Sequence, residues 1–162
     1  MPECHIYSAV TDGVCFIRLV GRLNFTTCAR FDAFIRNIFL QLHFKAVAID
    51  LCAVEHIDST ILGLLARIAR YTLIRYGHKP KIYSTRPDMN LLLDTMCFET
   101  AFDIVKESPD LPDDLVEIPV LDNEKPNPGL VVLSAHKTLM RMSKQNETAF
   151  RDVVEQLEKE QE

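Results

Sequence analysis

The sequence has 162 residues, of which 48% are hydrophobic and 25% are charged, as expected for a globular domain with an appendage. Its apolar runs are far shorter than the ~18 residues of a membrane helix, and its N-terminus lacks the features of a signal peptide, so we expect a cytoplasmic protein that does not act in a membrane. The net charge of −5 excludes a protein that binds nucleic acid through clustered lysines and arginines.

Residue types that bind metals or perform catalysis form no motif in the sequence. The five cysteines are scattered without a CxxC pair, which favours reduced thiols over disulfides or a zinc site. The five histidines form no HxxxH or HxH pair, and the GxxxxGK[ST], GxGxxG, GxSxG and HExxH signatures are absent. We therefore expect no metal, no cofactor and no catalytic residue, and the protein is not expected to be an enzyme.

The first part of the chain predicts two paired strands. Residues 5–20 consist of two apolar stretches on either side of Asp12 and Gly13, which is typical of a β-hairpin with a tight turn. The loop that follows can cap the next segment through Thr26 or Thr27. A helix is expected to begin directly after this loop.

Helices and strands alternate along the next part of the chain. Helical spacing of apolar residues predicts a helix over 28–44. Its buried face is expected to consist of Phe31, Phe34, Ile35, Ile38 and Leu42. Residues 45–51 are apolar and rich in β-branched side chains, as in a strand that is covered on both sides. A further helix is expected from Ser59 to Tyr76, where Gly77 ends it.

The last elements of this domain are a strand over 80–85, a helix over 86–96 with Pro87 in its first turn, and a strand near 102–105. The expected order is therefore β-β-α-β-α-β-α-β. This alternation implies an α/β fold, in which helices pack on a mixed sheet of four to five strands.

The composition changes near residue 106, so we expect one domain over 1–106. Residues 107–128 are rich in proline and acidic residues and predict a connector, with a short extended piece near 115–120. Residues 129–162 predict a helical C-terminal extension, formed as a hairpin or as one broken helix. Residues 106–162 contain 7 Lys and Arg against 13 Asp and Glu, so the negative charge is concentrated in this part.

An apolar stripe marks the second half of the extension. Its members are Ala149, Phe150, Val153, Val154 and Leu157. Asn146 followed by Glu147 can start this helix and complement its dipole. The extension is expected either to pack back on the first domain or to present the stripe to a partner.

The turn Asp58-Ser59-Thr60 joins a buried strand to a helix, and Ser59 allows three interpretations. It can cap the helix, because a side-chain oxygen there accepts a hydrogen bond from a free backbone N–H. It can act as a nucleophile with His56 as general base. It can also be a hydroxyl that another protein modifies, since a phosphate is well tolerated at a helix N-terminus. That phosphate would add about two negative charges beside Asp58 and disrupt partner binding without unfolding the domain.

The helix that begins at Ser59 has two faces of different character. One stripe is expected to be buried and consists of Leu62, Leu65, Ala69 and Leu73. The opposite stripe consists of Thr60, Gly63, Arg67, Arg70 and Ile74. This second stripe is either a solvated face or a docking surface, because a glycine lets another backbone approach closely.

Residues 46–65, AVAIDLCAVEHIDSTILGLL, resemble the signature of STAS domains of the anti-sigma factor antagonist type. Residues 14–31 are similar to the preceding strand, loop and first helix of that family, and the likeness covers about residues 5–105. The resemblance implies a STAS fold without catalysis of its own. It implies Ser59, and less readily Thr60, as the acceptor of phosphate from a serine kinase, with a phosphatase that removes it. The unphosphorylated form is then expected to bind an anti-sigma factor and free a sigma factor.

The resemblance also implies a partner-binding surface. Its expected members are Asn24, Thr26, Asp58, Thr60, Gly63 and Arg67. The chain departs from the family at Asn24, where aspartate is common, and at Ile61, where glycine is common. The helical extension resembles a proteobacterial subgroup that includes HsbA, which implies control of flagella or biofilms. The alternative is a non-phosphorylated STAS module that serves as a scaffold or ligand-sensing subunit of a signalling complex.

Overall fold

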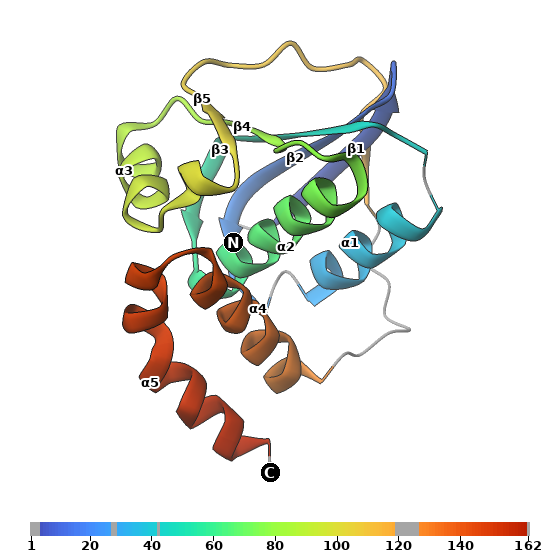
Figure 1. Ribbon diagram of the computed structural model, residues 1–162. Helices are drawn as coiled ribbons and strands as arrows, with labels where there is room; N and C mark the ends of the chain where they lie inside the picture. The colour runs from blue at the N-terminus through green and yellow to red at the C-terminus, as the bar shows by residue number, and fades with distance from the viewer. Residues whose placement is uncertain (1–3, 27–28, 42, 119–126, 162) are drawn as a thin grey trace.

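The computed structural model describes residues 4–26, 29–41, 43–118 and 127–161. Its centre is a six-stranded sheet with the strand order β5-β4-β3-β2-β1-β6 (Figure 1). The strands are β1 (His5–Thr11), β2 (Val14–Leu23), β3 (Ala46–Ile57), β4 (Lys81–Tyr83), β5 (Asp103–Val105) and β6 (Val116–Glu117). The sheet is larger than the predicted four to five strands because the short β6 comes from the connector.

The predicted hairpin is confirmed. Strands β1 and β2 pair antiparallel, with Thr11 opposite Val14 at the turn. Asp12 and Gly13 between them have φ angles of 52° and 78°, so both lie in the left-handed region. Two consecutive left-handed residues match the right-handed twist of the paired strands, and aspartate and glycine adopt this conformation most easily.

The predicted α/β order is confirmed as well. Strands β2, β3, β4 and β5 are parallel neighbours. Three helices connect them, namely α1 (Ala29–Gln41), α2 (Ser59–Tyr76) and α3 (Pro87–Thr95), the last followed by the short 3-10 helix η1 (Phe98–Thr100). Parallel strands require crossover connections of this kind, which cover the sheet with helices.

Helices α1 and α2 lie side by side in front of the sheet in Figure 1. The core between these layers contains the fully buried side chains of Ile17, Leu19, Ile49, Leu51, Phe31 and Ile35. Of the predicted face of α1, Phe31, Ile35 and Ile38 are buried and Phe34 is partly buried. Leu42 lies outside the described residues.

The predicted bounds of α2 are confirmed, with Gly77 as a left-handed C-cap at φ 78°. Leu62, Leu65 and Ala69 are buried as expected. The prediction for Leu73 is wrong, because its side chain is 54% exposed. Leu73 lines a surface hollow between α2 and the C-terminal helices, so the apolar periodicity continues past the point where the core ends.

The C-terminal extension forms a helical hairpin of α4 (Pro128–Met142) and α5 (Lys144–Glu160). It packs back on the domain through α4, which lies against α2, while α5 packs on α4 and extends away from the sheet (Figure 1). The extended piece in the connector is confirmed at β6, where Val116 lies opposite Ser8 of β1. The connector residues 119–126 lie outside the described part of the chain.

The second helix of the hairpin begins earlier than predicted. Ser143 is its N-cap and accepts a hydrogen bond from the backbone N–H of Asn146 at 3.0 Å. Asn146 is instead buried inside the first turn, and its Nδ2 donates to the backbone oxygen of Met96 at 2.8 Å. Of the predicted stripe, Val154 is buried, whereas Ala149 and Val153 are exposed.

The described cysteines, Cys4, Cys15, Cys52 and Cys97, are free thiols. Burial raises the pKa of the Cys15 thiol to about 11, so this side chain behaves as a small core residue. Cys28 lies outside the described residues. None of the described helices is both long and apolar enough to cross a membrane.

Candidate functional site

The loop after β2 and the first turn of α2 meet at one end of the sheet. Strands β2 and β3 are parallel neighbours with Leu23 opposite Ile57, so the segments that follow them leave the sheet at the same edge. The backbone N–H of Asp58 donates to the oxygen of Leu23 at 3.0 Å, and the N–H of Phe25 donates to Oδ2 of Asp58 at 3.0 Å. The structure therefore brings the loop residues of the predicted surface to the start of α2.

Asp58 is the residue that caps α2. Its backbone is extended, and its Oδ1 accepts the N–H of Ile61 at 2.9 Å. Ser59 is already the first helical residue, so its interpretation as the cap is wrong. A cap of this type contributes about 1 kcal/mol, and the second oxygen of Asp58 also fixes the loop through Phe25. In that loop, Oδ1 of Asn24 accepts the N–H of Thr26 at 3.1 Å.

The side chain of Ser59 points to a histidine of the C-terminal extension. Its Oγ lies 2.8 Å from Nε2 of His136, and Nδ1 of the same ring lies 2.7 Å from the backbone oxygen of Val132. That carbonyl can only accept, so Nδ1 carries a proton, and in the corresponding neutral tautomer Nε2 accepts the hydrogen bond from the serine hydroxyl. His136 is 5% exposed, and its ring lies edge-on to Phe150 with centroids 5.5 Å apart.

His56 takes no part in this contact. The side chain is exposed at the end of β3, as expected for a residue that leaves the strand. The pair of Ser59 and His136 resembles the first two members of a catalytic triad, but the third position is the carbonyl of Val132 and not a carboxylate. Four surface hollows of the described chain are lined by other residues, and the described residues contain no cluster of three metal-binding side chains.

Gly63 is the point of closest approach between α2 and α4. A Cβ atom at this position would lie 2.6 Å from the carbonyl carbon of Ala135 and 2.7 Å from its Cβ. Such distances do not occur between real atoms, so any larger residue would push the two helices apart. The predicted close approach of another backbone to Gly63 is therefore present, and the backbone is that of the chain's own C-terminal extension.

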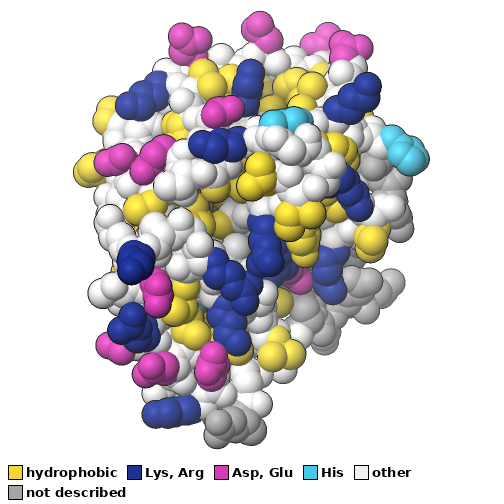
Figure 2. Space-filling view, viewed as in Figure 1, with side chains coloured by type: hydrophobic (Ala, Val, Ile, Leu, Met, Phe, Trp, Pro, Cys, Tyr) yellow, Lys and Arg dark blue, Asp and Glu magenta, His cyan; other side chains and the backbone are white. Residues whose placement is uncertain are grey.

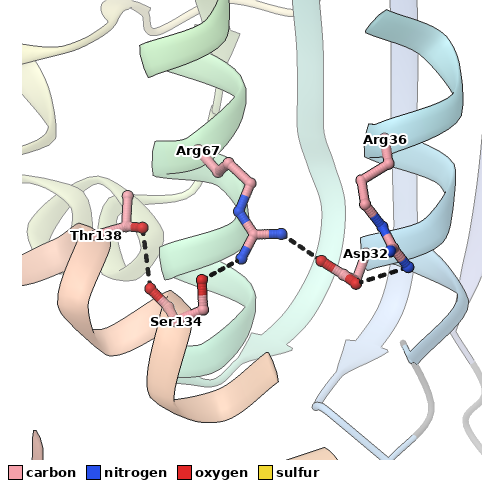
Figure 3. A network of polar contacts seen from close by, with 5 residues as sticks. All are labelled: Asp32, Arg36, Arg67, Ser134 and Thr138. Carbon is pink, nitrogen blue, oxygen red and sulfur yellow. Dashed lines mark hydrogen bonds and ion pairs between the residues drawn. The ribbon is translucent and has the colours of Figure 1, made fainter. Parts of the chain in front are cut away.

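Arg67 joins three helices (Figure 3). Its guanidinium group forms an ion pair with Asp32 of α1 and donates to Oγ of Ser134 of α4 at 2.8 Å. Asp32 also pairs with Arg36 at 3.2 Å, one turn further along α1. The side chain of Asp32 is 7% exposed and that of Arg67 is 12% exposed, so this ion pair is largely removed from water.

The stripe of α2 that was interpreted as either a solvated face or a docking surface is divided in two. Its first half is covered, because Thr60 is 4% exposed and Gly63 is buried beneath α4. Its second half is free, and both Arg70 and Ile74 are exposed. On the face of the molecule that Figure 2 shows, Lys and Arg side chains gather in the middle, where α2 and α4 lie. A solvated face is thus the wrong interpretation for the half that begins at Ser59.

Comparison with known proteins identifies the fold. The family model of the STAS domain matches residues 5–106. The chain belongs to the STAS domain family. A search of curated proteins found no match to the sequence.

Solved structures are similar to the STAS domain of this chain. An anti-sigma factor antagonist from Mycobacterium paratuberculosis has 20% identity and a TM-score of 0.56, over 63% of this chain and 85% of that one. The Bacillus protein SpoIIAA has 17% identity, with a TM-score of 0.51 over 64% of this chain and 92% of that one in its phosphorylated form. The unphosphorylated form gives a TM-score of 0.53 and covers 89% of that chain. At these identities the likeness establishes the STAS fold.

Helices α4 and α5 lie beyond the residues that the STAS family model matches. His136, Ala135 and Ser134, which contact the predicted surface, all belong to α4 and were not predicted. A weak signal existed, since His136 stands in the apolar stripe of α4 between Ala135 and Leu139. Nothing in that pattern linked the histidine to Ser59.

Proposed function

We propose that this STAS protein is an anti-sigma factor antagonist that binds its partner through the surface around Ser59. The observation that carries the proposal is the position of Ser59. It is the first residue of α2, and its hydroxyl is directed toward α4. The structural likeness to an anti-sigma factor antagonist and to both forms of SpoIIAA supports this function.

Phosphorylation of Ser59 would control the binding. The phosphate would lie beside the carboxylate of Asp58, and a partner pressed against this corner would have to remove both from water. Ser59 is a better acceptor than Thr60, because Thr60 is 4% exposed and Ser59 is only partly buried. A serine kinase and a phosphatase in the cytoplasm would set the ratio of the phosphorylated and unphosphorylated forms. The unphosphorylated form would bind the anti-sigma factor and so free a sigma factor. If the chain belongs to the HsbA-like subgroup, that sigma factor would control flagellar or biofilm genes.

One observation favours a second candidate. The hydrogen bond between Ser59 and His136 gives the serine a structural role without any modification. The chain would then be a non-phosphorylated STAS module, a scaffold or ligand-sensing subunit, in which Ser59 holds α4 in place.

Two variants of Ser59 separate these candidates. Purified Ser59→Ala and Ser59→Asp chains are used to capture proteins from a lysate of the source cells. The phosphate on the wild-type chain is mapped by mass spectrometry after incubation with the same lysate, which supplies the kinase, and ATP. We expect an anti-sigma factor to be enriched at least about tenfold by Ser59→Ala over Ser59→Asp, since a full charge in the contact costs more than one decade in affinity. Equal capture by both variants, with Ser59 unmodified, would favour the structural module.

A further inference from the structure

The residues that we propose as the partner-binding surface are in contact with the chain's own α4. Ser59 meets His136, Gly63 meets Ala135, and Arg67 meets Ser134. Ser59, Gly63 and Arg67 lie four residues apart on one face of α2, whereas Ser134, Ala135 and His136 are consecutive, so α4 crosses α2 and meets this face with a single turn. The same stripe therefore has an occupant in the structure, and that occupant is a helix.

We propose that the stripe of α2 from Ser59 to Arg67 is a helix-binding surface, that α4 occupies it within the chain, and that the anti-sigma factor enters with a helix of the same pattern in competition with α4. This inference rests on the proposed function. The helix α4 is thus an intramolecular inhibitor, and it also shows what kind of partner the surface accepts.

The first part of that pattern is steric. Ala135 lies so close to Gly63 that even a methyl group on Gly63 would overlap its backbone. The position of the incoming helix that faces Gly63 therefore accepts only a small residue. One turn along α4, Leu139 is fully buried in the core. A competing helix therefore needs alanine, glycine or serine at the crossing point and a leucine-sized side chain four residues later.

The second part of the pattern is polar. Ser59 offers a hydroxyl to a hydrogen-bond acceptor, which is His136 in α4, and Arg67 offers a guanidinium N–H to Ser134. Beside the stripe, Arg70 is exposed, and Arg36 and Arg67 share the single carboxylate of Asp32, so this border carries a net positive charge. Acidic side chains at the border of the incoming helix would complement these arginines, so the expected partner segment is an acidic amphipathic helix.

The contact made by α4 is partly polar, which favours exchange. Its buried residues are Ala135, His136, Thr138 and Leu139, so half of them are polar. Contacts of this polarity resemble those of transient complexes. The connector tethers α4 near the stripe at an effective concentration of about millimolar. A partner helix that is present at a lower concentration therefore has to bind the stripe more tightly than α4 does in order to displace it.

Access to Ser59 depends on the same exchange. The hydroxyl oxygen is 2.8 Å from Nε2 of His136, and this separation leaves no room for a phosphoryl group between the two atoms. A phosphorylated serine also lacks the proton that the hydroxyl donates to the ring. A kinase would therefore act on chains in which α4 has left the stripe, and the phosphate would keep α4 from returning.

The proposal is tested by measuring how tightly a labelled peptide with the wild-type sequence of residues 127–161 binds to the purified full-length protein. The Ala135→Arg variant places a large charged side chain over Gly63 and is expected to expel its own α4, while Ala149→Arg makes the same exchange at an exposed position of α5. Fluorescence anisotropy is expected to show at least about tenfold tighter peptide binding by Ala135→Arg than by wild type, because the surface is vacant in a larger fraction of molecules. Ala149→Arg is expected to match the wild type.

His136→Ala is a second variant that adds no atoms and so avoids overlap in the core. It removes the hydrogen bond to Ser59 and is expected to tighten peptide binding by about fivefold, as for the loss of one hydrogen bond. Peptide binding by both variants that equals that of the wild type would overturn the proposal. The peptide-binding experiment contains neither an anti-sigma factor nor phosphate. A negative result would therefore leave the proposed function untouched. A negative result in the capture experiment would likewise leave the peptide-binding result valid.

Discussion

Replacing Gly63 with alanine is expected to release α4 from α2 while the STAS domain stays folded. The added methyl group would lie 2.6 Å from the carbonyl carbon of Ala135, and overpacking of this kind costs about 1–3 kcal/mol. Within α2 the same change is favourable by about 0.5–1 kcal/mol, because alanine is a better helix former than glycine. The penalty therefore falls on the contact between the helices, and hydrogen exchange measured by mass spectrometry should be at least about tenfold faster in α4.

Ile74→Ala is the matched control for this experiment. It lies on the same helix, its side chain is 73% exposed, and it is remote from the crossing point with α4. Exchange in α4 is expected to be unchanged in this variant. If Gly63→Ala leaves the exchange of α4 as slow as in the wild type, the close approach at Gly63 does not hold α4 in place.

The largest loss of stability is expected when Arg67 is replaced with alanine. The change leaves the carboxylate of Asp32, which is 7% exposed, without its buried partner and removes the hydrogen bond to Ser134. Breaking a buried ion pair typically costs about 3–5 kcal/mol, because one charge then stays in a site of low polarity. Urea unfolding followed by circular dichroism measures this loss as a lower midpoint.

Arg36→Ala is the control, since Arg36 pairs with the same carboxylate but has a side chain that is 50% exposed. Solvent screens this pair, so a loss below about 1 kcal/mol is expected. The double change Asp32→Leu with Arg67→Leu should recover most of the stability, because no buried charge is left without a partner and the charge of Arg36 is exposed to solvent. A loss below about 1 kcal/mol for Arg67→Ala, as small as that expected for Arg36→Ala, would show that Arg67 does not stabilise the domain, and would leave partner binding as its main role.

The hairpin, the crossovers and the ends of α2 could be predicted because each depends on local signals. Asp12 and Gly13 specify a turn by their own backbone preferences, and Gly77 ends α2 in a left-handed conformation. Leu73 was predicted wrongly for a related reason. Periodicity marks one face of a helix, but it does not mark where the material under that face ends.

The cap of α2 shows a finer limit. Asp58 and Ser59 are both good capping residues, and the sequence alone does not decide between them. The backbone decides, because Asp58 is extended at φ −95° and ψ 171° while Ser59 is already helical. Ser59 is therefore free to turn its hydroxyl toward another segment.

The partner of Ser59 could not be predicted, because 77 positions separate it from His136. That contact exists only after the extension has folded back, and the apolar stripe of α4 does not specify where it docks. Gly63 did carry a signal, since a glycine inside a helix lowers stability unless something lies close to it. The signal indicated a close neighbour without indicating that the neighbour is part of the same chain.

In the proposed switch, the state of Ser59 decides what occupies the stripe of α2. The most direct test is hydrogen exchange of α4 in a full-length chain that carries phosphoserine at position 59, compared with the unmodified chain. We expect amides of α4 to exchange at least about tenfold faster in the phosphorylated chain, with no change in the strands β2 and β3. Equal protection of α4 in the two chains would show that the phosphate on Ser59 does not decide whether α4 occupies the stripe.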